Sequence, residues 1–265
     1  MSQPTRWLKR YRPVAAPRFR LICLPHGGGT ASFFRSWAEA LPPEVELAAI
    51  QYPGRQDRLA ENCIEAMEPL VDSIADAVQP LLDAPFAVFG HSMGATVGYE
   101  VTRRLEARQT PPRHLFVSGK ATPFKERTGR QLHREDDAAM LAGVRELGGL
   151  HETFLDDPDL LEVVLPSLRA DLRLMETYRP TPDAAIATPV TAYVGDADPG
   201  VTVAEAAAWA ETTSGGFTLR TFPGGHFFLT DHRDVLVSDL LGRVAAPSST
   251  PGDRHIDSAV RPATP

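Results

Sequence analysis

The pentapeptide Gly90-His91-Ser92-Met93-Gly94 constrains the fold of this chain more than any other segment. It follows the apolar run 85–89 and precedes a segment with helical periodicity, 95–108. A G-x-S-x-G sequence between a strand and a helix is typical of a tight turn that lifts the serine clear of a sheet. Glycine is needed beside such a serine, because the neighbouring backbone leaves no room for a Cβ. The alternative is a glycine-rich turn without a chemical role, and the strand and helix patterns on either side favour the nucleophile.

The rest of the chain alternates short apolar runs with longer helical patterns. The expected strands are 18–24, 45–51, 86–90, 114–118, 190–194 and 217–222. The expected helices include 32–41, 66–82, 95–108, 203–213 and 234–244. Most of the strands are almost continuously apolar, as strands covered on both faces should be. The pattern predicts an α/β fold with a mostly parallel central sheet and helices on both faces.

The 265 residues fit one domain, which we place at 18–245 between an N-terminal tail, 1–17, and a C-terminal tail, 246–265. The C-terminal tail is rich in Pro, Ser, Thr and Ala and is predicted to be disordered. Between two strands, an insertion over about 120–189 holds helical segments at 135–147 and 160–178. It is longer than an ordinary crossover and is expected to form a helical lid over the carboxyl edge of the sheet. The alternative is two extra packing helices.

Composition narrows the class of partner and the compartment. A net charge of −7 argues against nucleic acid, because binding phosphates requires a basic surface. The two cysteines, Cys23 and Cys63, have no metal-ligand spacing and cannot form a disulfide framework. The N-terminal segment has no apolar core for a signal peptide, and no run approaches the roughly 18 apolar residues of a membrane helix. We therefore expect a cytoplasmic protein that uses no metal and no organic cofactor.

A serine nucleophile needs a base, and the base needs an acid to orient it. The best base is His226, which follows the last predicted strand on a loop made pliable by two glycines; a helix-capping histidine is the alternative. The acid is expected just after strand 190–194, where Asp196 and Asp198 are both present. We favour Asp198, which lies past the turn, and expect Asp196 to cap that turn. The order Ser92, Asp198, His226 is that of α/β-hydrolases.

An oxyanion needs preset donors. One is expected at the backbone N–H of Met93, at the start of the helix. The second is expected from the glycine run after the first predicted strand, with Gly27 preferred and Gly28 next. A phosphate-binding loop is the rival interpretation of these glycines, but no Lys-Ser/Thr follows them.

Together these residues make the chain similar to the type II thioesterases that accompany modular polyketide and nonribosomal peptide synthases. The resemblance runs from about residue 21 to 226. Besides the serine turn, it rests on 26-HGGG-29 with Ser32, Phe33, Phe34 and Trp37, on 51-QYPGR-55 with Arg58, on 166-PSLRAD-171 with Glu176 and Tyr178, on 195-GDADP-199 and on 224-GGHF-227. Gly27 departs from the family, which more often has alanine there, and makes the loop similar to the HGGG box of some lipases and esterases.

The resemblance implies an α/β-hydrolase fold and hydrolysis of acyl groups from the phosphopantetheine arm of an acyl or peptidyl carrier protein, typically to clear stalled units. A medium-chain fatty acyl thioesterase and a general carboxylesterase are alternatives on the same fold. A catalytically silent protein that binds an acyl group or a synthase is the alternative outside enzymes, and the intact Ser92, Asp198 and His226 argue against it.

Carrier proteins are generally acidic, so a basic surface is expected where one docks. Five basic residues and one acidic residue, Glu126, lie between 120 and 134, and we take Lys120, Lys125, Arg127 and Arg130 as the docking candidates. A solvated loop is the alternative. The acyl group is expected to contact Phe33, Phe227 and Phe228, although aromatic residues at such positions are more often part of the core.

Overall fold

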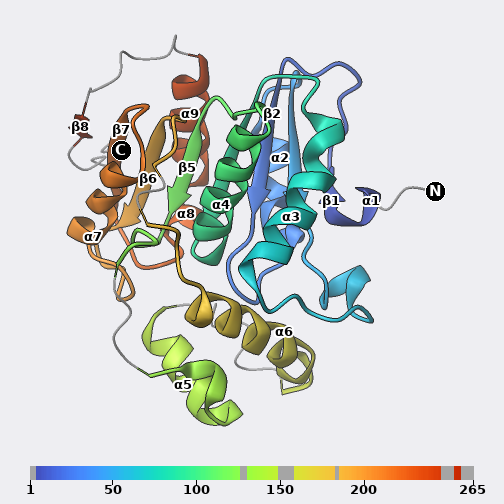
Figure 1. The fold of residues 1–265 in the computed structure, drawn as a ribbon, viewed down its shortest axis with the longest axis vertical. Coiled ribbons are helices and arrows are strands. Elements are labelled where there is room, and N and C mark those ends of the chain that lie inside the picture. Colours follow the sequence, from blue (N-terminus) through green and yellow to red (C-terminus); the bar gives the residue numbers. More distant parts are fainter. Residues whose placement is uncertain (1–3, 126–129, 149–157, 183–184, 246–253, 258–265) are drawn as a thin grey trace.

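The computed structural model describes residues 4–125, 130–148, 158–182, 185–245 and 254–257 (Figure 1). Strands in these residues form one sheet in the order β1-β3-β2-β4-β5-β6-β7-β8. Their bounds are β1 Leu8–Lys9, β2 Phe19–Leu24, β3 Val45–Ile50, β4 Phe86–His91, β5 Leu115–Ser118, β6 Val190–Gly195, β7 Phe217–Phe222 and β8 Arg254–Asp257. β1 runs antiparallel to β3, and the other neighbouring pairs are parallel. The predicted parallel sheet is confirmed, and each expected strand agrees with an observed one within a residue at either end.

The helices also follow the predicted pattern. Their bounds are α1 Pro4–Trp7, α2 Arg35–Ala40, α3 Met67–Val78, α4 Met93–Ala107, α5 Asp137–Glu146, α6 Pro158–Thr177, α7 Val203–Ala207, α8 Phe228–Asp231 and α9 Arg233–Ala245. Three of the expected helices are part 3-10, because single turns precede α2 and follow α3 and α7. No described helix is both long and apolar enough to cross a membrane.

Helices cover both faces of the sheet, which explains why most of the strands are almost continuously apolar. On one face, α3 and α4 pack on the strands in a core that includes Ile74, Tyr99 and Trp209. On the other face, α2, α8 and α9 form a core that includes Trp37 and Leu240. Successive strand residues point to opposite faces, so alternate side chains of each strand enter the two cores.

The insertion between β5 and β6 has a small core of its own. Leu132, Met140, Val144 and Leu168 are buried together where α5 and α6 meet. Figure 1 shows these two helices beyond one end of the strands, apart from the helices that flank the sheet. The expected helical insertion is therefore present, although residues 126–129 and 149–157 of it lie outside the described residues.

Both terminal segments differ from the tails that we predicted. In the N-terminal segment, β1 pairs with β3, and the carbonyl of Trp7 accepts a 2.8 Å hydrogen bond from the Gln51 N–H. The Arg58 guanidinium also lies over the Trp7 ring, 4.1 Å from the centroid of that ring. The prediction missed this because a two-residue strand leaves almost no periodic pattern. At the other end, 254–257 form β8 beside β7, and the rest of 246–265 lies outside the described residues.

Candidate active site

Ser92 lies between the last residue of β4 and the first residue of α4, as the sequence predicted. Its backbone adopts φ 54° and ψ −115°, a conformation that L-residues rarely adopt. A Cβ on Gly90 would lie 2.0 Å from the Gly94 carbonyl oxygen, and one on Gly94 would lie 2.1 Å from the Leu24 carbonyl oxygen. The two flanking glycines are therefore required by backbone contacts, which confirms the predicted tight turn.

His226 and Asp198 meet from two neighbouring strand ends. Asp198 follows β6 and His226 follows β7, and His226 Nδ1 lies 2.8 Å from Asp198 Oδ2. The Asp198 side chain is fully buried, and that of His226 is 7% exposed. The other carboxylate oxygen of Asp198 accepts the Gly200 N–H at 2.8 Å, so the acid is held at both oxygens. This arrangement fixes the imidazole ring and leaves Nε2 for a second partner.

Asp196, the other candidate acid, points elsewhere. Its Oδ1 accepts the Gly224 N–H at 2.9 Å, which joins the turns after β6 and β7. The expectation that Asp196 caps a turn while Asp198 orients the histidine agrees with both sets of contacts.

Ser92 and His226 line the same cavity, which has a volume of about 400 Å³. Its floor includes His26, Gly27 and Met93 at the carboxyl edge of the sheet. Its other walls come from the insertion, whose apolar contributors are Leu132, Val144, Leu147, Leu168, Leu172 and Met175. Ser92 and the histidine of the His226–Asp198 pair thus face a partly open cavity with an apolar wall, as in many sites for small organic groups.

The glycine loop after β2 brings one of its predicted donors to the cavity. Gly27 lines the cavity, as Met93 does. The Gly28 N–H instead donates to Asp171 Oδ2 at 2.7 Å, and the Gly29 N–H donates to the His26 carbonyl at 3.0 Å. Gly28 is therefore wrong as an oxyanion donor, because a carboxylate from α6 already occupies its amide. Nothing in the local sequence indicates a partner 143 positions away.

The three phenylalanines predicted to contact substrate are not among the residues that line the cavity. Phe33 and Phe227 pack edge-on against the His26 ring, with centroids 4.9 and 5.0 Å from it. Phe228 is 2% exposed and stacks on Phe222 in the core under α8. Phe228 is therefore core and wrong as a substrate contact, whereas for Phe33 and Phe227, which are partly buried beside His26, substrate contact stays a prediction. The apolar wall comes from α5 and α6, whose aliphatic residues the sequence did not distinguish from ordinary core.

The basic segment is partly at the cavity. Lys120, Lys125 and Arg130 contribute to its lining, whereas Arg127 lies outside the described residues. Lys125 forms an ion pair with Glu205, and Arg130 Nε lies 3.3 Å from Glu135 Oε1. Both ion pairs are exposed, so solvent screens them. A charged group on a partner protein can therefore compete for Lys125 and Arg130.

His91, beside the serine, is fully buried and takes a different role from His226. Its Nδ1 lies 3.0 Å from Ser118 Oγ, and its ring centroid lies 4.9 Å from that of His226. Burial, followed by the proximity of His226 and His26, holds the pKa of His91 well below its usual 6.5. His91 is therefore neutral, and it packs between Ser118 at the end of β5 and the ring of His226.

Comparison with known proteins decides the family. A family model for the thioesterase domain matches residues 19–243. The chain belongs to this thioesterase family. It is 42% identical over 252 residues to thioesterase PikA5 of Streptomyces venezuelae, which covers 94% of this chain and 89% of PikA5. The enzyme is therefore a hydrolase that acts on thioesters, and the resemblance read from its motifs is confirmed.

Comparison with solved structures also places this chain among the type II thioesterases. The type II thioesterase BorB from the borrelidin biosynthetic cluster is 42% identical, with a TM-score of 0.84 over 90% of this chain and 97% of BorB. YbtT, a type II thioesterase from the yersiniabactin NRPS/PKS pathway, is 26% identical, with a TM-score of 0.80 over 90% of this chain and 98% of YbtT. The thioesterase thus has the α/β-hydrolase fold of these relatives.

Proposed function

We propose that this thioesterase hydrolyses acyl groups from the phosphopantetheine arm of a carrier protein, as an editing enzyme of a polyketide or nonribosomal peptide synthase. The observation that carries the proposal is one cavity that holds Ser92, the His226–Asp198 pair and an apolar wall from the insertion. The cluster and pathway named for BorB and YbtT support the synthase as the source of the substrate.

In the proposed mechanism, Ser92 Oγ attacks the thioester carbonyl while His226 Nε2 takes the hydroxyl proton. The negative charge that develops on the carbonyl oxygen is stabilised by the backbone N–H groups of Met93 and Gly27. Collapse of the tetrahedral species breaks the C–S bond, and the leaving thiolate takes the proton from His226. Water then attacks the acyl-serine with His226 again as the base, which restores Ser92 and releases the acid. Asp198 stabilises the imidazolium in both halves of the cycle.

The insertion is proposed to cover the acyl group as a lid. Its aliphatic residues at the cavity, such as Leu172 and Met175, can remove an acyl chain from water, and each buried CH₂ contributes about 0.8 kcal/mol. The charged groups at the same cavity, including Lys120 and Arg130, suit the polar arm and its phosphate rather than the acyl end.

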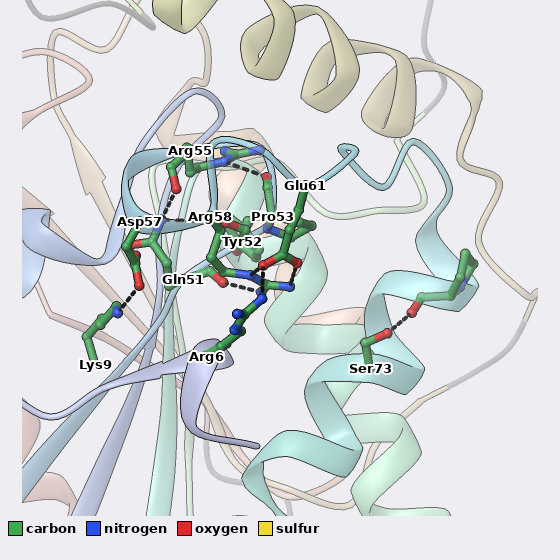
Figure 2. A network of polar contacts seen from close by, with 11 residues as sticks. Arg6, Lys9, Gln51, Tyr52, Pro53, Arg55, Asp57, Arg58, Glu61 and Ser73 are labelled. Atoms are coloured by element: carbon green, nitrogen blue, oxygen red, sulfur yellow. Dashed lines mark hydrogen bonds and ion pairs between the residues drawn. The ribbon is translucent and has the colours of Figure 1, made fainter. Parts of the chain in front are cut away.

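The proposed function is tested with an acyl carrier protein loaded with a medium-length acyl group. We expect Ser92→Ala to abolish release of the acid, whereas Ser73→Ala, which removes an exposed hydroxyl from α3, should leave the rate unchanged (Figure 2 shows Ser73). A p-nitrophenyl ester of the same acid serves as the oxygen-ester comparison. Turnover by Ser92→Ala at the native rate would refute the mechanism, and a preference for the ester would favour a general carboxylesterase.

The basic residues at the cavity are proposed to dock the carrier. We expect Lys125→Glu with Arg130→Glu to raise KM for the acyl carrier protein about tenfold or more while changing it little for a free pantetheine thioester. The matched control is Arg18→Glu with Arg113→Glu, because these exposed residues precede β2 and β5 at the opposite edge of the sheet. If both substrates respond alike, or if the control variant loses as much, these residues do not dock the carrier.

A further inference from the structure

We propose that Asp171 and Arg55 are positioning residues that hold the glycine loop, 26–29, against the start of α4. In this arrangement α6 must be seated on the loop for the Gly27 amide to take its place beside Ser92. The inference rests on the proposed function and deepens it, because it assigns a role to Arg55 and to Asp171, which lines the same cavity as Ser92.

The contact is a buried ion pair between distant parts of the chain. Asp171 is on α6, and Arg55 is in the loop after β3. Arg55 Nη1 lies 2.7 Å from Asp171 Oδ2, and Arg55 Nη2 lies 2.9 Å from Oδ1, so the pair is bidentate. Each side chain is 5% exposed. Burial acts against the charge on Arg55, but Asp171, together with Cys63 and Tyr52, raises the pKa of the guanidinium above its usual value.

Both partners also hold the glycine loop directly. Asp171 Oδ2 accepts the Gly28 N–H at 2.7 Å, and Arg55 Nη1 donates to the Gly29 carbonyl at 3.2 Å. The ion pair therefore binds the loop at two consecutive residues, one through a donor and one through an acceptor. Charge-assisted bonds of this kind are short and directional, so they fix position as well as contribute energy.

The loop transmits that position to the site. A Cβ on Gly27 would lie 3.7 Å from Asp171 Cβ and 4.0 Å from Met93 Cβ, so Gly27 lies between α6 and the first residue of α4. On its other side, the backbone of Leu24 and Pro25 lies against Gly94 in the same helical turn. A shift of Asp171 would therefore move the Gly27 amide relative to Met93, the two groups proposed to bind the oxyanion.

Arg55 is also held by contacts within its own segment. Figure 2 shows the segment from Gln51 to Glu61 folded on itself, with Arg55 Nε donating to the Pro53 carbonyl at 3.3 Å. Arg58 donates to the Gln51 carbonyl at 2.8 Å and pairs with Glu61 at 2.6 Å. The guanidinium thus projects from a hydrogen-bonded turn, and α6 of the insertion supplies its carboxylate partner.

The test compares Asp171→Asn with Asp137→Asn. The second substitution removes the carboxylate of the exposed ion pair between Asp137 and Arg169 in the same insertion. We expect Asp171→Asn to lower kcat about 10²-fold, as loss of one oxyanion donor does, with KM changed less than about threefold. Affinity for a boronic acid that forms a tetrahedral adduct on Ser92 should fall by the same factor. Asp137→Asn should match the wild type in all three.

A double variant keeps the inference testable if Asp171→Asn does not fold. Arg55→Gln with Asp171→Asn leaves no buried charge without its partner, and we expect its kcat to be no lower than that of the worse single variant. Wild-type kcat in either variant, even with a lowered Tm, would overturn the positioning role and leave a structural one. If instead the wild type releases no acid at all, the proposed function fails, a result that these variants cannot mimic.

Discussion

Gly94 is the residue at which the packing of α4 on the site can be tested most sharply. A Cβ there would lie 2.1 Å from the Leu24 carbonyl oxygen and 2.7 Å from that of Pro25. Ordinary contacts begin near 3.4 Å, so the helix and the loop would have to separate by about 1.3 Å. Both partners are backbone, and no side-chain rotation can relieve the overlap. Gly94→Ala is therefore expected to move the glycine loop away from Met93.

The expected cost follows from two opposing terms. Overpacking of this kind costs about 3 kcal/mol or more, and alanine regains about 1 kcal/mol through its higher helix propensity. We expect a net loss of about 2 kcal/mol or more, or about 4–8 °C in Tm for a chain of this size. A displacement of about 1 Å in the site should also lower kcat about 10²-fold. Urea unfolding and thioester hydrolysis measure the two effects, and wild-type values in both would refute the packing argument.

Substitutions at three other residues test the stability, its pH dependence and the acyl site. Gly242, in α9, has nothing within 4 Å of an added Cβ, so Gly242→Ala should raise the free energy of unfolding by about 0.8–1 kcal/mol in urea; a decrease would contradict this. Because the pKa of His91 is well below 6.5 in the folded state, the unfolded chain binds the extra proton, and His91 should lower stability by about 1.4 kcal/mol per pH unit as pH drops below 6.5, in addition to the same effect of His114, whose pKa burial lowers to about 3. His91→Gln should reduce that slope between pH 6.5 and 5, and an equal slope would exclude His91 as its source. Leu172→Trp should reduce kcat/KM for a long acyl thioester more than for an acetyl thioester, with the exposed Val235→Trp as control; equal losses would place the acyl group elsewhere.

The strands and the catalytic order could be predicted because they depend on local pattern. Continuous apolar runs identify strands covered on both faces, and the turn after β6 distinguishes Asp198 from Asp196 through spacing alone. The errors concern partners chosen by the tertiary fold. Phe228 and Leu172 are both apolar residues near functional motifs, and only the packing shows that the first is core and the second lines the cavity.

The motifs that carry the family resemblance also show that tertiary contacts could not be predicted from the sequence. Arg55 and Asp171 belong to two of the segments that carry the resemblance to type II thioesterases, yet their residue types alone assigned them no role. They lie 116 positions apart and meet only because the insertion folds back over the sheet edge. Their separation explains why a resemblance could identify the segments while the contact between them required the structure.

The structure distinguishes Gly27, where the family more often has alanine, from Gly28 by the space around each and by the backbone angle φ. A Cβ at Gly27 would meet nothing closer than 3.7 Å, and its φ is not in the left-handed region, whereas Gly28 has φ 71° and a 3.3 Å contact with Leu168. Alanine therefore fits at 27 without moving the loop, and it restricts the unfolded chain. We expect Gly27→Ala to retain kcat and to gain about 0.4–1 kcal/mol in stability, whereas Gly28→Ala should lose both. Retained activity in Gly27→Ala would show that the glycine at this position does not indicate a lipase-like HGGG box. Loss of activity in Gly27→Ala would show that the close approach of backbone to substrate does require glycine there.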